Sequence, residues 1–286
     1  MEASELKLPE SRPARRKMSL RNKLLFYLVA WLIVLMPFLF WRSTWFGRPL
    51  NDRDLGSYLK DDKKPRHIQH ALVQIGDRMS KGDSGVRQWY PELVRLAAYP
   101  VEEVRNTDAW VMGQDTSFPD FHGALLTMLD DPSPLVRGNA ALALVRFHDA
   151  SGRPQILEML QPLKVTAPTA ATVTAVARSG EPANHGTVLV KLKSGDEVTE
   201  VRAPISGRIR AISAQPGASV AAGAEVAVLD PGTDQVWEAL RALYVIGTPD
   251  DLPHVTPYER ETPEYPQGVA QQAVETERAI RQRASR

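Results

Sequence analysis

The clearest feature of the hydrophobic pattern is one long apolar run near the N-terminus, Leu24–Trp41. At about 1.5 Å per residue, a helix over this run is about as long as the hydrocarbon core of a bilayer is thick. Trp41, Trp45 and Phe46 stand at its end, as aromatic residues do at a membrane interface. Pro37 is tolerated inside membrane helices. The pattern therefore predicts a transmembrane helix over residues 24–41.

Farther along the chain, apolar residues recur every three to four positions in two regions, residues 66–162 and 233–286. This spacing places them on one face of an α-helix and predicts helices that pack against one another. The stripes are formed by Ile68, Leu72, Ile75 and Met79, by Leu93, Val94 and Leu96, by Phe121, Leu125 and Leu129, and by Val236, Leu240 and Leu243.

Between these regions, residues 163–232 alternate apolar and polar positions and are interrupted by glycine and proline, a pattern typical of short strands and tight turns. The segment repeats, because Ala167–Val176 aligns with Ala203–Ile212 and one inserted residue brings the later glycines into register. Neither half is long enough to bury a face alone, so we expect the halves to pack on each other. The structural positions marked by the repeat are Ala167, Pro168, Gly180 and Gly186 in the first half and Ala203, Pro204, Gly207, Gly217 and Gly223 in the second.

The repeated pattern Ala-Pro-x-x-Gly-x-Ile, followed by spaced glycines and an apolar pair, resembles the biotinyl/lipoyl-type barrel-sandwich hybrid domain. The resemblance implies a small all-β domain that is a cofactor carrier in some enzymes and a structural part of periplasmic adaptor proteins in others. Carriers place a lysine at the tip of the hairpin between the halves. Here that tip is the tight turn Ser194-Gly195-Asp196, and Lys191 and Lys193 lie on the strand before it. The sequence therefore favours a structural domain without a cofactor, with a biotin or lipoyl carrier as the alternative.

A second repeat lies in the first helical region, where Pro100–Met112 aligns with Pro132–Leu144. Proline, Val-Arg, alanine and large apolar positions coincide at about the spacing of one helix pair. The pattern resembles the short bacterial form of the HEAT repeat, a compact variant of a family whose period is about forty residues or more. Arg105 and Arg137 occupy equivalent positions, and the resemblance implies that each ties successive repeats together.

These observations predict a multidomain α plus β chain, in which a solenoid of HEAT-like helix pairs is interrupted by a small all-β domain. Insertions in repeat proteins emerge from turns on one face, so a helical stack tolerates such an insert. The expected order is a basic tail at residues 1–23, the transmembrane helix at 24–41, a juxtamembrane tether at 42–65, HEAT-like helices at 66–162, the barrel-sandwich hybrid at 163–232 and C-terminal HEAT-like helices at 233–286.

The charges that flank the apolar run set its expected orientation. Basic residues crowd its N-terminal side, whereas Asp52 and Asp54 partly offset the arginines on its C-terminal side. Because positively charged flanks stay in the cytoplasm, we expect a single-pass inner-membrane protein with a cytoplasmic N-terminus and a periplasmic or extracytoplasmic bulk. No small-x-small cleavage site follows the run, which favours an uncleaved signal anchor. The basic residues are Lys7, Arg12, Arg15, Arg16, Lys17, Arg21 and Lys23.

Residues of the types that carry out catalysis are present, but not in catalytic patterns. The chain has no cysteine, which excludes disulfides and thiolate chemistry, and its net charge of +1 gives no support for nucleic-acid binding. His67 and His70 share a helical face and could bind a metal with Asp61 or Asp62, but a polar helix start explains them better. The paired carboxylates Asp130 and Asp131 fit a helix boundary before a proline. We therefore expect no catalytic, cofactor-binding or metal-binding residue, and no enzyme.

A solenoid presents an extended concave surface, which favours protein recognition. We therefore expect a membrane-anchored extracytoplasmic scaffold or adaptor, an accessory subunit of a bacterial envelope complex with protein partners. A membrane-fusion-type subunit of an efflux or secretion system is the first alternative. Such subunits normally carry a long coiled-coil hairpin between the barrel halves, whereas this chain has only Lys193–Glu200 there. A biotin or lipoyl carrier is the second alternative.

Overall fold

The computed structural model describes residues 19–44 and 49–285. Contacts divide the chain into two compact units, residues 1–49 and residues 50–286. The first unit contains helix α1 (Leu20–Thr44), with Pro37 inside it. Its segment Leu20–Phe38 is long and apolar enough to cross a membrane, and none of that segment is buried. Among residues 19–44 and 49–285, one helix suited to a membrane is therefore present, and it overlaps the run predicted from the sequence.

Part of the sequence evidence for the membrane helix and for its orientation lies outside the described residues. These undescribed positions include the tail up to Lys17 and the aromatic residues Trp45 and Phe46. Arg21 and Lys23 lie in the first turns of α1. The described structure thus supports a candidate membrane helix and leaves its direction a prediction.

The second unit begins with helices, as the 3.6-residue periodicity predicts. Proline stands in the first turn of most of them, where its missing N–H costs no hydrogen bond and its fixed φ suits the helix. The elements are α2 (Asp52–Leu59), α3 (Pro65–Ser80), the 3₁₀-helix η1 (Ser84–Trp89), α4 (Tyr90–Leu96), α5 (Glu102–Met112), α6 (Pro119–Met128), α7 (Pro134–Arg146) and α8 (Arg153–Glu158).

Further helices follow the strands. They are α9 (Thr233–Ile246), η2 (Pro249–Asp251), α10 (Leu252–Val255), η3 (Thr256–Tyr258) and α11 (Gln267–Ala284). Helix α9 packs against α7 and α8, so the chain returns to the same stack after the strands. The hydrogen bond from Gln235 Nε2 to the Met159 carbonyl, at 2.9 Å, joins the two helical segments directly.

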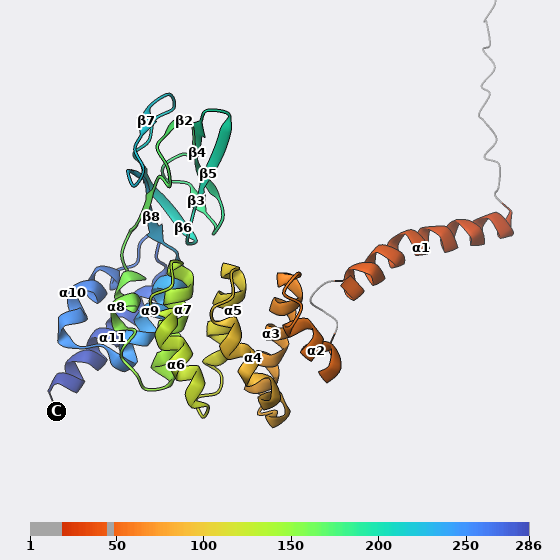
Figure 1. The fold of residues 1–286 in the computed structure, drawn as a ribbon, viewed down its shortest axis with the longest axis horizontal. Helices are drawn as coiled ribbons and strands as arrows, with labels where there is room; N and C mark the ends of the chain where they lie inside the picture. Colours follow the sequence, from red (N-terminus) through yellow and green to blue (C-terminus); the bar gives the residue numbers. More distant parts are fainter. Residues whose placement is uncertain (1–18, 45–48, 286) are drawn as a thin grey trace, which may run out of the picture. The chain divides into compact units, whose positions relative to one another are not determined.

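The helices form two layers, as Figure 1 shows. One layer contains α3, α5, α7 and α9, each in contact with the next, and α11 packs on α9. The other contains α4, α6 and α8, which pack against the first layer. One continuous apolar cluster fills the space between the layers, with Phe121 as its largest fully buried side chain. This arrangement satisfies the apolar stripes seen in the sequence.

The segment expected as a tether, residues 42–65, also contributes to this cluster. Helix α2 begins after the N-cap Asn51, whose side chain accepts the Asp54 N–H. Leu55 and Leu59 of α2 are fully buried in the helical cluster, and Leu50 is nearly so. The helical stack therefore begins at Leu50, earlier than the hydrophobic periodicity indicated, because a short helix with two buried leucines carries too little periodic signal.

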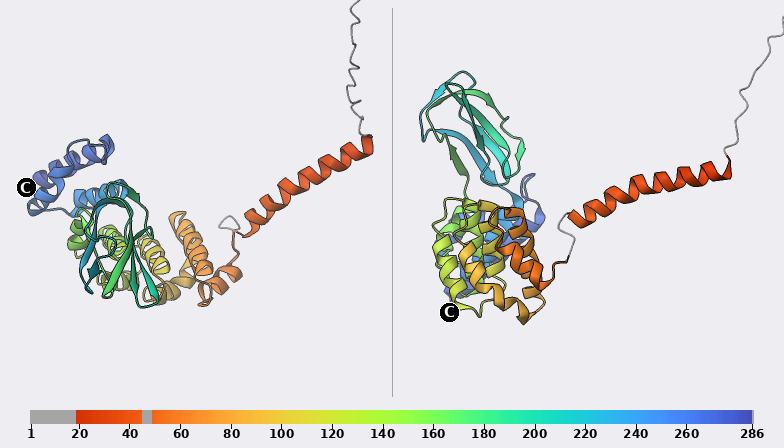
Figure 2. Two further views of the ribbon diagram at one scale, coloured as in Figure 1. Left: turned by 90° about the horizontal axis from the view of Figure 1, so that it is seen from above. Right: turned by 45° about the vertical axis from the view of Figure 1, so that its right-hand side comes forward.

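Eight strands lie between α8 and α9 and form two four-stranded antiparallel sheets. We call this part the β domain, and Figure 2 shows its strands gathered in a body beside the helices. One sheet has the order β1-β8-β6-β3 and the other β5-β4-β2-β7. The strands are β1 (Leu163–Thr166), β2 (Ala171–Val176), β3 (Pro182–Ala183), β4 (Val188–Ser194), β5 (Glu197–Arg202), β6 (Gly207–Ile212), β7 (Ser219–Val220) and β8 (Glu225–Pro231). The mixed helical and antiparallel β architecture predicted from the sequence is confirmed.

The two sheets are built alike, with strands exchanged between the sequence halves. Each of β1 to β4 corresponds to the strand four places later, and this exchange turns one sheet order into the other. Each sheet therefore contains strands of both halves. A second apolar cluster, distinct from the helical one, lies within the β domain and includes Val173, Leu192, Ile209 and Leu229. Packing of the halves on each other gives each half the partner it needs to bury a face.

The repeated glycines hold this exchange in place. The Gly180 N–H donates to the Ile209 carbonyl and the Gly217 N–H to the Val173 carbonyl, at 2.7 and 2.8 Å. Both glycines have a φ of +87°, a conformation that other residues rarely adopt. Equivalent bonds run from the Gly186 N–H to the Ala203 carbonyl and from the Gly223 N–H to the Ala167 carbonyl, each at 2.8 Å.

The other marked positions in the β domain are occupied for different reasons. Gly207 begins β6 beside β8, where a Cβ would lie 1.9 Å from the Asp230 carbonyl oxygen. A side chain at that position would push the two strands apart. Ala167 and Ala203 are buried at the ends of β1 and β5, and Pro168 and Pro204 follow them into the turns.

Candidate protein-interaction site

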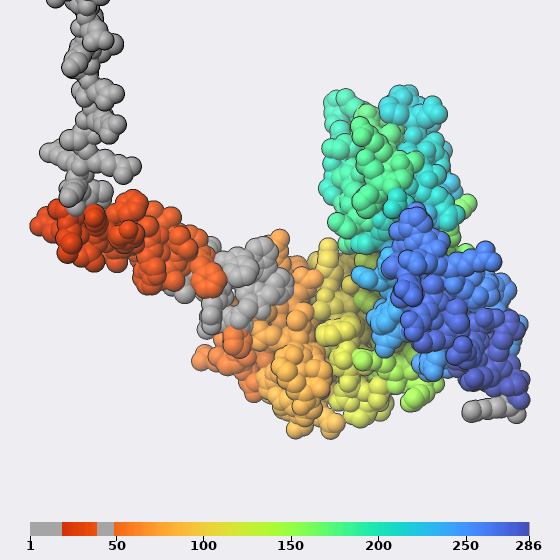
Figure 3. All heavy atoms as spheres, turned by 180° about the vertical axis from the view of Figure 1, so that it is seen from behind, coloured from red at the N-terminus to blue at the C-terminus, as the bar shows by residue number. Residues whose placement is uncertain are grey.

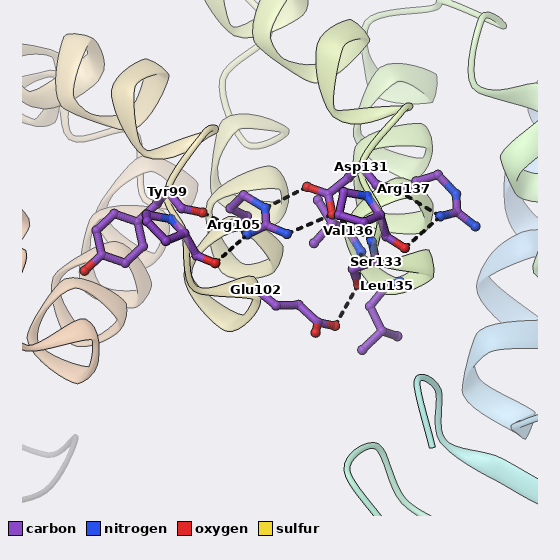
Figure 4. Close-up of polar contacts among 10 residues, drawn as sticks. Tyr99, Glu102, Arg105, Asp131, Ser133, Leu135, Val136 and Arg137 are labelled. Carbon is purple, nitrogen blue, oxygen red and sulfur yellow. Dashed lines mark hydrogen bonds and ion pairs between the residues drawn. The ribbon is translucent and has the colours of Figure 1, made fainter. Parts of the chain in front are cut away.

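Arg105 joins two successive helix pairs of the stack, as Figure 4 shows. From α5, its guanidinium donates two hydrogen bonds to the Asp131 carboxylate, at 2.6 and 2.9 Å. It also donates to the carbonyls of Tyr99 and Pro100. The side chains of Arg105 and Asp131 are only 11% and 7% exposed. A bidentate pair with so little water around it is a strong contact between repeats.

Asp131 also organises the start of α7. Its carboxylate accepts the Ser133 N–H at 2.8 Å, and the Ser133 hydroxyl accepts the N–H groups of Leu135 and Val136. Burial raises the pKa of Asp131, but hydrogen bonds from Arg105 and Ser133 outweigh burial and hold that pKa below its ordinary value. The carboxylate is therefore ionised at neutral pH and serves both the arginine and the helix start.

Arg137 repeats this arrangement one helix pair later, with a weaker partner. Its guanidinium donates to the carbonyls of Asp131 and Pro132, just as Arg105 donates to the preceding turn. Its carboxylate partner is Glu158, at 3.3 Å, and that side chain is 61% exposed. Exposed pairs contribute little to stability. The two arginines occupy equivalent places but bind acids of unequal burial.

A small polar and apolar junction connects the helices with the β domain. The Ser133 hydroxyl donates to Glu102 Oε1 at 2.7 Å, and His185 Nε2 lies 3.3 Å from the same oxygen. Leu135, in the first turn of α7, packs against the apolar cluster of the β domain. The His185 N–H in turn donates to the Ser206 hydroxyl. These few contacts position the β domain beside the N-terminal ends of α5 and α7.

Asp108 is the one fully buried carboxyl group of α5. Neither of its oxygens has a hydrogen-bond partner among the described residues. Burial raises the pKa of Asp108 well above its ordinary value of 3.8, and the charge of Arg95 acts weakly in the opposite direction. In the sequence repeat Asp108 stands where the next copy has Ala140, which is also fully buried. The group is therefore a buried carboxyl, held toward its neutral form, that the repeat does not require.

A groove of about 720 Å³ opens on the layer formed by α5, α7, α9 and α11. We call it the helical groove. Three large apolar side chains in it remain exposed to solvent, namely Trp110 at 45%, Tyr244 at 47% and Val245 at 48%. Figure 3 shows one face of the helical stack on which α5, in yellow, and α9 and α11, in blue, are all exposed. Exposed aromatic side chains gathered in a concave surface are typical of binding sites.

The packing beneath the groove holds Trp110 in place. Its indole lies so close to Gly76 of α3 that a Cβ there would be 2.7 Å from the ring. Gly113, one helical turn beyond Trp110, similarly accommodates Ala143 of α7. Arg146, from the end of α7, donates to the Gly113 carbonyl at 3.2 Å. An arginine side chain is therefore fixed one turn from the exposed indole.

The polar residues of the groove divide between its walls. On α9, Arg241 lies 3.5 Å from Glu238 and 4.6 Å from the ring centroid of Trp237. Arg146 on α7 and Glu275 on α11 have no ion-pair partner among residues 19–44 and 49–285. The groove thus carries a positive charge on one wall and a negative charge on the other.

The histidines singled out from the sequence lie away from the groove. His67 Nδ1 is 2.9 Å from Asp61 Oδ2, and its ring stacks on Tyr58. His70 Nε2 is 2.6 Å from Gln74 Nε2. In the described parts of the chain, no three histidine, aspartate or glutamate side chains gather as metal ligands would.

Two further groups of polar residues are a histidine of α6, His122, and the paired carboxylates Asp130 and Asp131. His122 Nε2, on α6, lies 2.6 Å from Oδ2 of Asp149, which follows α7. Asp131 serves Arg105 as described, whereas Asp130 is exposed beside it. Contacts between neighbouring helices or turns therefore explain His122 and Asp131.

The hairpin between the halves of the β domain has a two-residue tip. Ser194 pairs with Glu197, leaving Gly195 and Asp196 in the turn. Lys191 and Lys193 lie on β4, and the Lys191 ammonium is 3.0 Å from Glu200 of β5. The tip itself therefore carries an aspartate, and neither lysine lies in the turn.

Comparison with protein families gives a match for one part of the helical stack. The HEAT repeat family model matches residues 123–150, a stretch that includes most of α6 and all of α7. The HEAT-like nature predicted for this region is confirmed. No curated protein matches the chain.

One solved structure is described as "Structure and function of a single-chain, multi-domain long-chain acyl-CoA carboxylase". The match covers 35% of the present chain, at 27% sequence identity and a TM-score of 0.24. The chain matches 10% of the length of that protein.

Two features of this site are not predicted by the sequence pattern. The groove depends on residues from α5, α7, α9 and α11, which are far apart in the sequence. The available signal was Trp110, an aromatic residue in the repeat position that Leu142 occupies in the next copy. The junction of Glu102 with His185 has no comparable signal, because single polar residues on separate elements form no motif.

Proposed function

We propose that this chain is a membrane-anchored scaffold or adaptor that binds partner proteins in the helical groove, as an accessory subunit of a bacterial envelope complex. The observation that carries the proposal is the concave surface with exposed Trp110, Tyr244 and Val245. The HEAT match supports it, because stacked helical repeats present concave surfaces to other proteins. The anchor would be α1, whose apolar segment suits a membrane.

The proposed location is the inner membrane, with the N-terminus in the cytoplasm and residues 50–286 in the periplasm. The support is the excess of basic residues before α1. Alkaline phosphatase fused after Arg286 is active only outside the cytoplasm, so the fusion is expected to be active in intact cells. A fluorescent protein that requires the cytoplasm should be dark at the same position. The reverse pattern would contradict the proposed orientation.

We further propose that the β domain is a barrel-sandwich hybrid of the biotinyl/lipoyl type that has lost the carrier role. Support comes from its internal repeat with exchanged strands and from the Gly195-Asp196 tip. On this proposal the chain is not an enzyme and the β domain is structural. The intact mass of the protein should then equal that of the polypeptide, whereas a biotin or lipoyl adduct on Lys191 or Lys193 would restore the carrier alternative.

Site-specific photocrosslinking tests the binding role. A benzophenone amino acid at Tyr244, in the intact chain in native membranes, should give a discrete adduct whose partner mass spectrometry identifies. Val198 is the matched control, because it is 54% exposed and lies on the β4–β5 hairpin away from the groove. Adducts from Val198 and none from Tyr244 would move the binding surface to the β domain and overturn the proposal.

A further inference from the structure

The charged residues of the helical groove indicate the charge pattern expected of its ligand. Its apolar floor alone would accept many partners, but its walls differ in sign. Arg146 stands on the α7 wall and Glu275 on the α11 wall, and the intervening Arg241 and Glu238 pair with each other on α9. The charge available to a ligand is therefore positive at one side and negative at the other.

The position of Arg146 relative to Trp110 indicates how the ligand's charged and apolar groups are arranged. The Arg146 guanidinium donates one N–H to the Gly113 carbonyl, which fixes it one helical turn from Trp110 while leaving other N–H groups free to donate. A carboxylate that accepts from this guanidinium lies beside the indole. An apolar or aromatic side chain next to that carboxylate would then contact Trp110, Tyr244 or Val245.

The size of the groove matches a short length of polypeptide rather than a folded domain. About 720 Å³ lies within the range of about 300–1,000 Å³ for sites that enclose small ligands. A peptide segment in extended form, held by one anchor side chain and by charges at both ends, fits these dimensions. It also matches the way in which grooves usually recognise short segments of other proteins.

We propose that the helical groove binds an extended peptide segment of its protein partner, with an acidic residue next to an apolar or aromatic anchor and a basic residue farther along. The acidic residue pairs with Arg146, the anchor side chain lies on Trp110 and Tyr244, and the basic residue faces Glu275. This inference rests on the proposed binding role of the groove and adds the chemistry of the partner.

Selection from random twelve-residue peptides displayed on phage provides the probe, with the full-length chain purified in detergent micelles. The enriched sequences should contain Asp or Glu within three residues of Trp, Tyr, Phe or Leu. A fluorescein-labelled copy of one such peptide is then titrated by anisotropy. Arg146→Gln, which keeps an N–H donor for the Gly113 carbonyl but removes the charge, should weaken binding about tenfold.

Charge exchange and a matched control separate recognition from damage to the fold. Replacing the peptide's acidic residue by lysine should abolish binding to the natural chain and restore it toward Arg146→Glu. Trp110→Ala should weaken binding by at least tenfold, whereas Arg53→Glu, an exposed arginine on α2 outside the groove, should leave it unchanged. Glu275→Gln, which does not touch the packing beneath Trp110, checks the second wall independently.

The outcomes distinguish this inference from the proposed function. If selected peptides lack carboxylates and bind Arg146→Gln as well as the natural chain, yet lose affinity with Trp110→Ala, the groove binds proteins and the inferred chemistry is wrong. If Trp110→Ala and Glu275→Gln both leave binding unchanged, the groove is not the site and the proposed function fails with it.

Discussion

The helical stack and the β domain are both built from internal repeats, but only the β domain closes on itself. There, the Gly180 and Gly217 N–H groups bond across to the opposite half, so that each half completes the sheets of the other. In the stack, Arg105 reaches forward to Asp131 of the next helix pair. A closed repeat satisfies its own surfaces. An open repeat of stacked helices leaves a concave face, and in this molecule that face carries the exposed side chains of the helical groove.

The separation of the two apolar clusters gives the largest expected effect. Phe121→Ala removes the largest fully buried side chain of the helical cluster and should cost about 3–5 kcal/mol of unfolding free energy. Leu192→Ala, in the cluster of the β domain, should cost about 2–5 kcal/mol. Because the clusters are distinct, each substitution should loosen its own region. Hydrogen exchange measured by mass spectrometry on the full chain reports both regions at once.

The informative result is the pattern rather than the size of the change. Phe121→Ala should speed exchange in α3–α9 and leave β2, β4, β6 and β8 protected. Leu192→Ala should do the reverse. Loss of protection in both regions from either substitution would show that the two clusters unfold as one and would remove the distinction between an open stack and a closed domain.

Arg105 and Arg137, at equivalent repeat positions, test how burial of the ion pair affects stability between helix pairs. Arg105→Ala leaves Asp131 nearly buried without its partner and should cost about 3 kcal/mol. Arg137→Ala removes two hydrogen bonds to carbonyls and an exposed ion pair, and should cost about 1 kcal/mol. Urea unfolding of the full chain in detergent, followed by tryptophan fluorescence, compares them. Equal losses of unfolding free energy from the two substitutions would show that burial of the Arg105–Asp131 pair adds nothing to stability.

The buried Asp108 predicts a smaller gain in stability with a definite pH dependence. Its raised pKa means that the folded state binds the proton more tightly than the unfolded state, so stability falls as the pH rises above 3.8 toward that raised pKa. Asp108→Ala, which installs the residue of the next repeat, should raise stability at pH 7 by about 1–3 kcal/mol. The gain should shrink toward pH 4. A gain that is constant between pH 4 and pH 7 would rule out the raised pKa of Asp108 as its cause.

The sequence predicted the elements better than their contacts. The apolar run, the helical stripes and the alternating segment each reflect a local periodicity, and each corresponds to an element of the structure. The internal repeat of the β domain also indicated that its halves pack together, since neither could bury a face alone. Helix α2 was not assigned to the stack because Leu55 and Leu59 are too few to form a stripe.

The candidate site was less predictable because it is assembled from separate helices. Arg105 and Arg137 were recognisable as repeated positions, but their acids, Asp131 and Glu158, depend on which turns meet. Trp110 and Tyr244 could equally have been core residues on hydrophobicity alone. Only the position of α9 beside α7, after seventy residues of intervening chain at 163–232, places them in one groove.

Excision of the β domain tests most directly whether the open helical stack is the binding part of the molecule. Gln235 and Met159 lie on either side of the excised segment and are joined by a hydrogen bond, so a short Gly/Ser linker can replace residues 163–232. The account predicts that this chain stays helical by circular dichroism and that a benzophenone at Tyr244 still gives the adduct seen with the intact chain. A helical chain that has lost the adduct, or a chain that no longer folds, would contradict it.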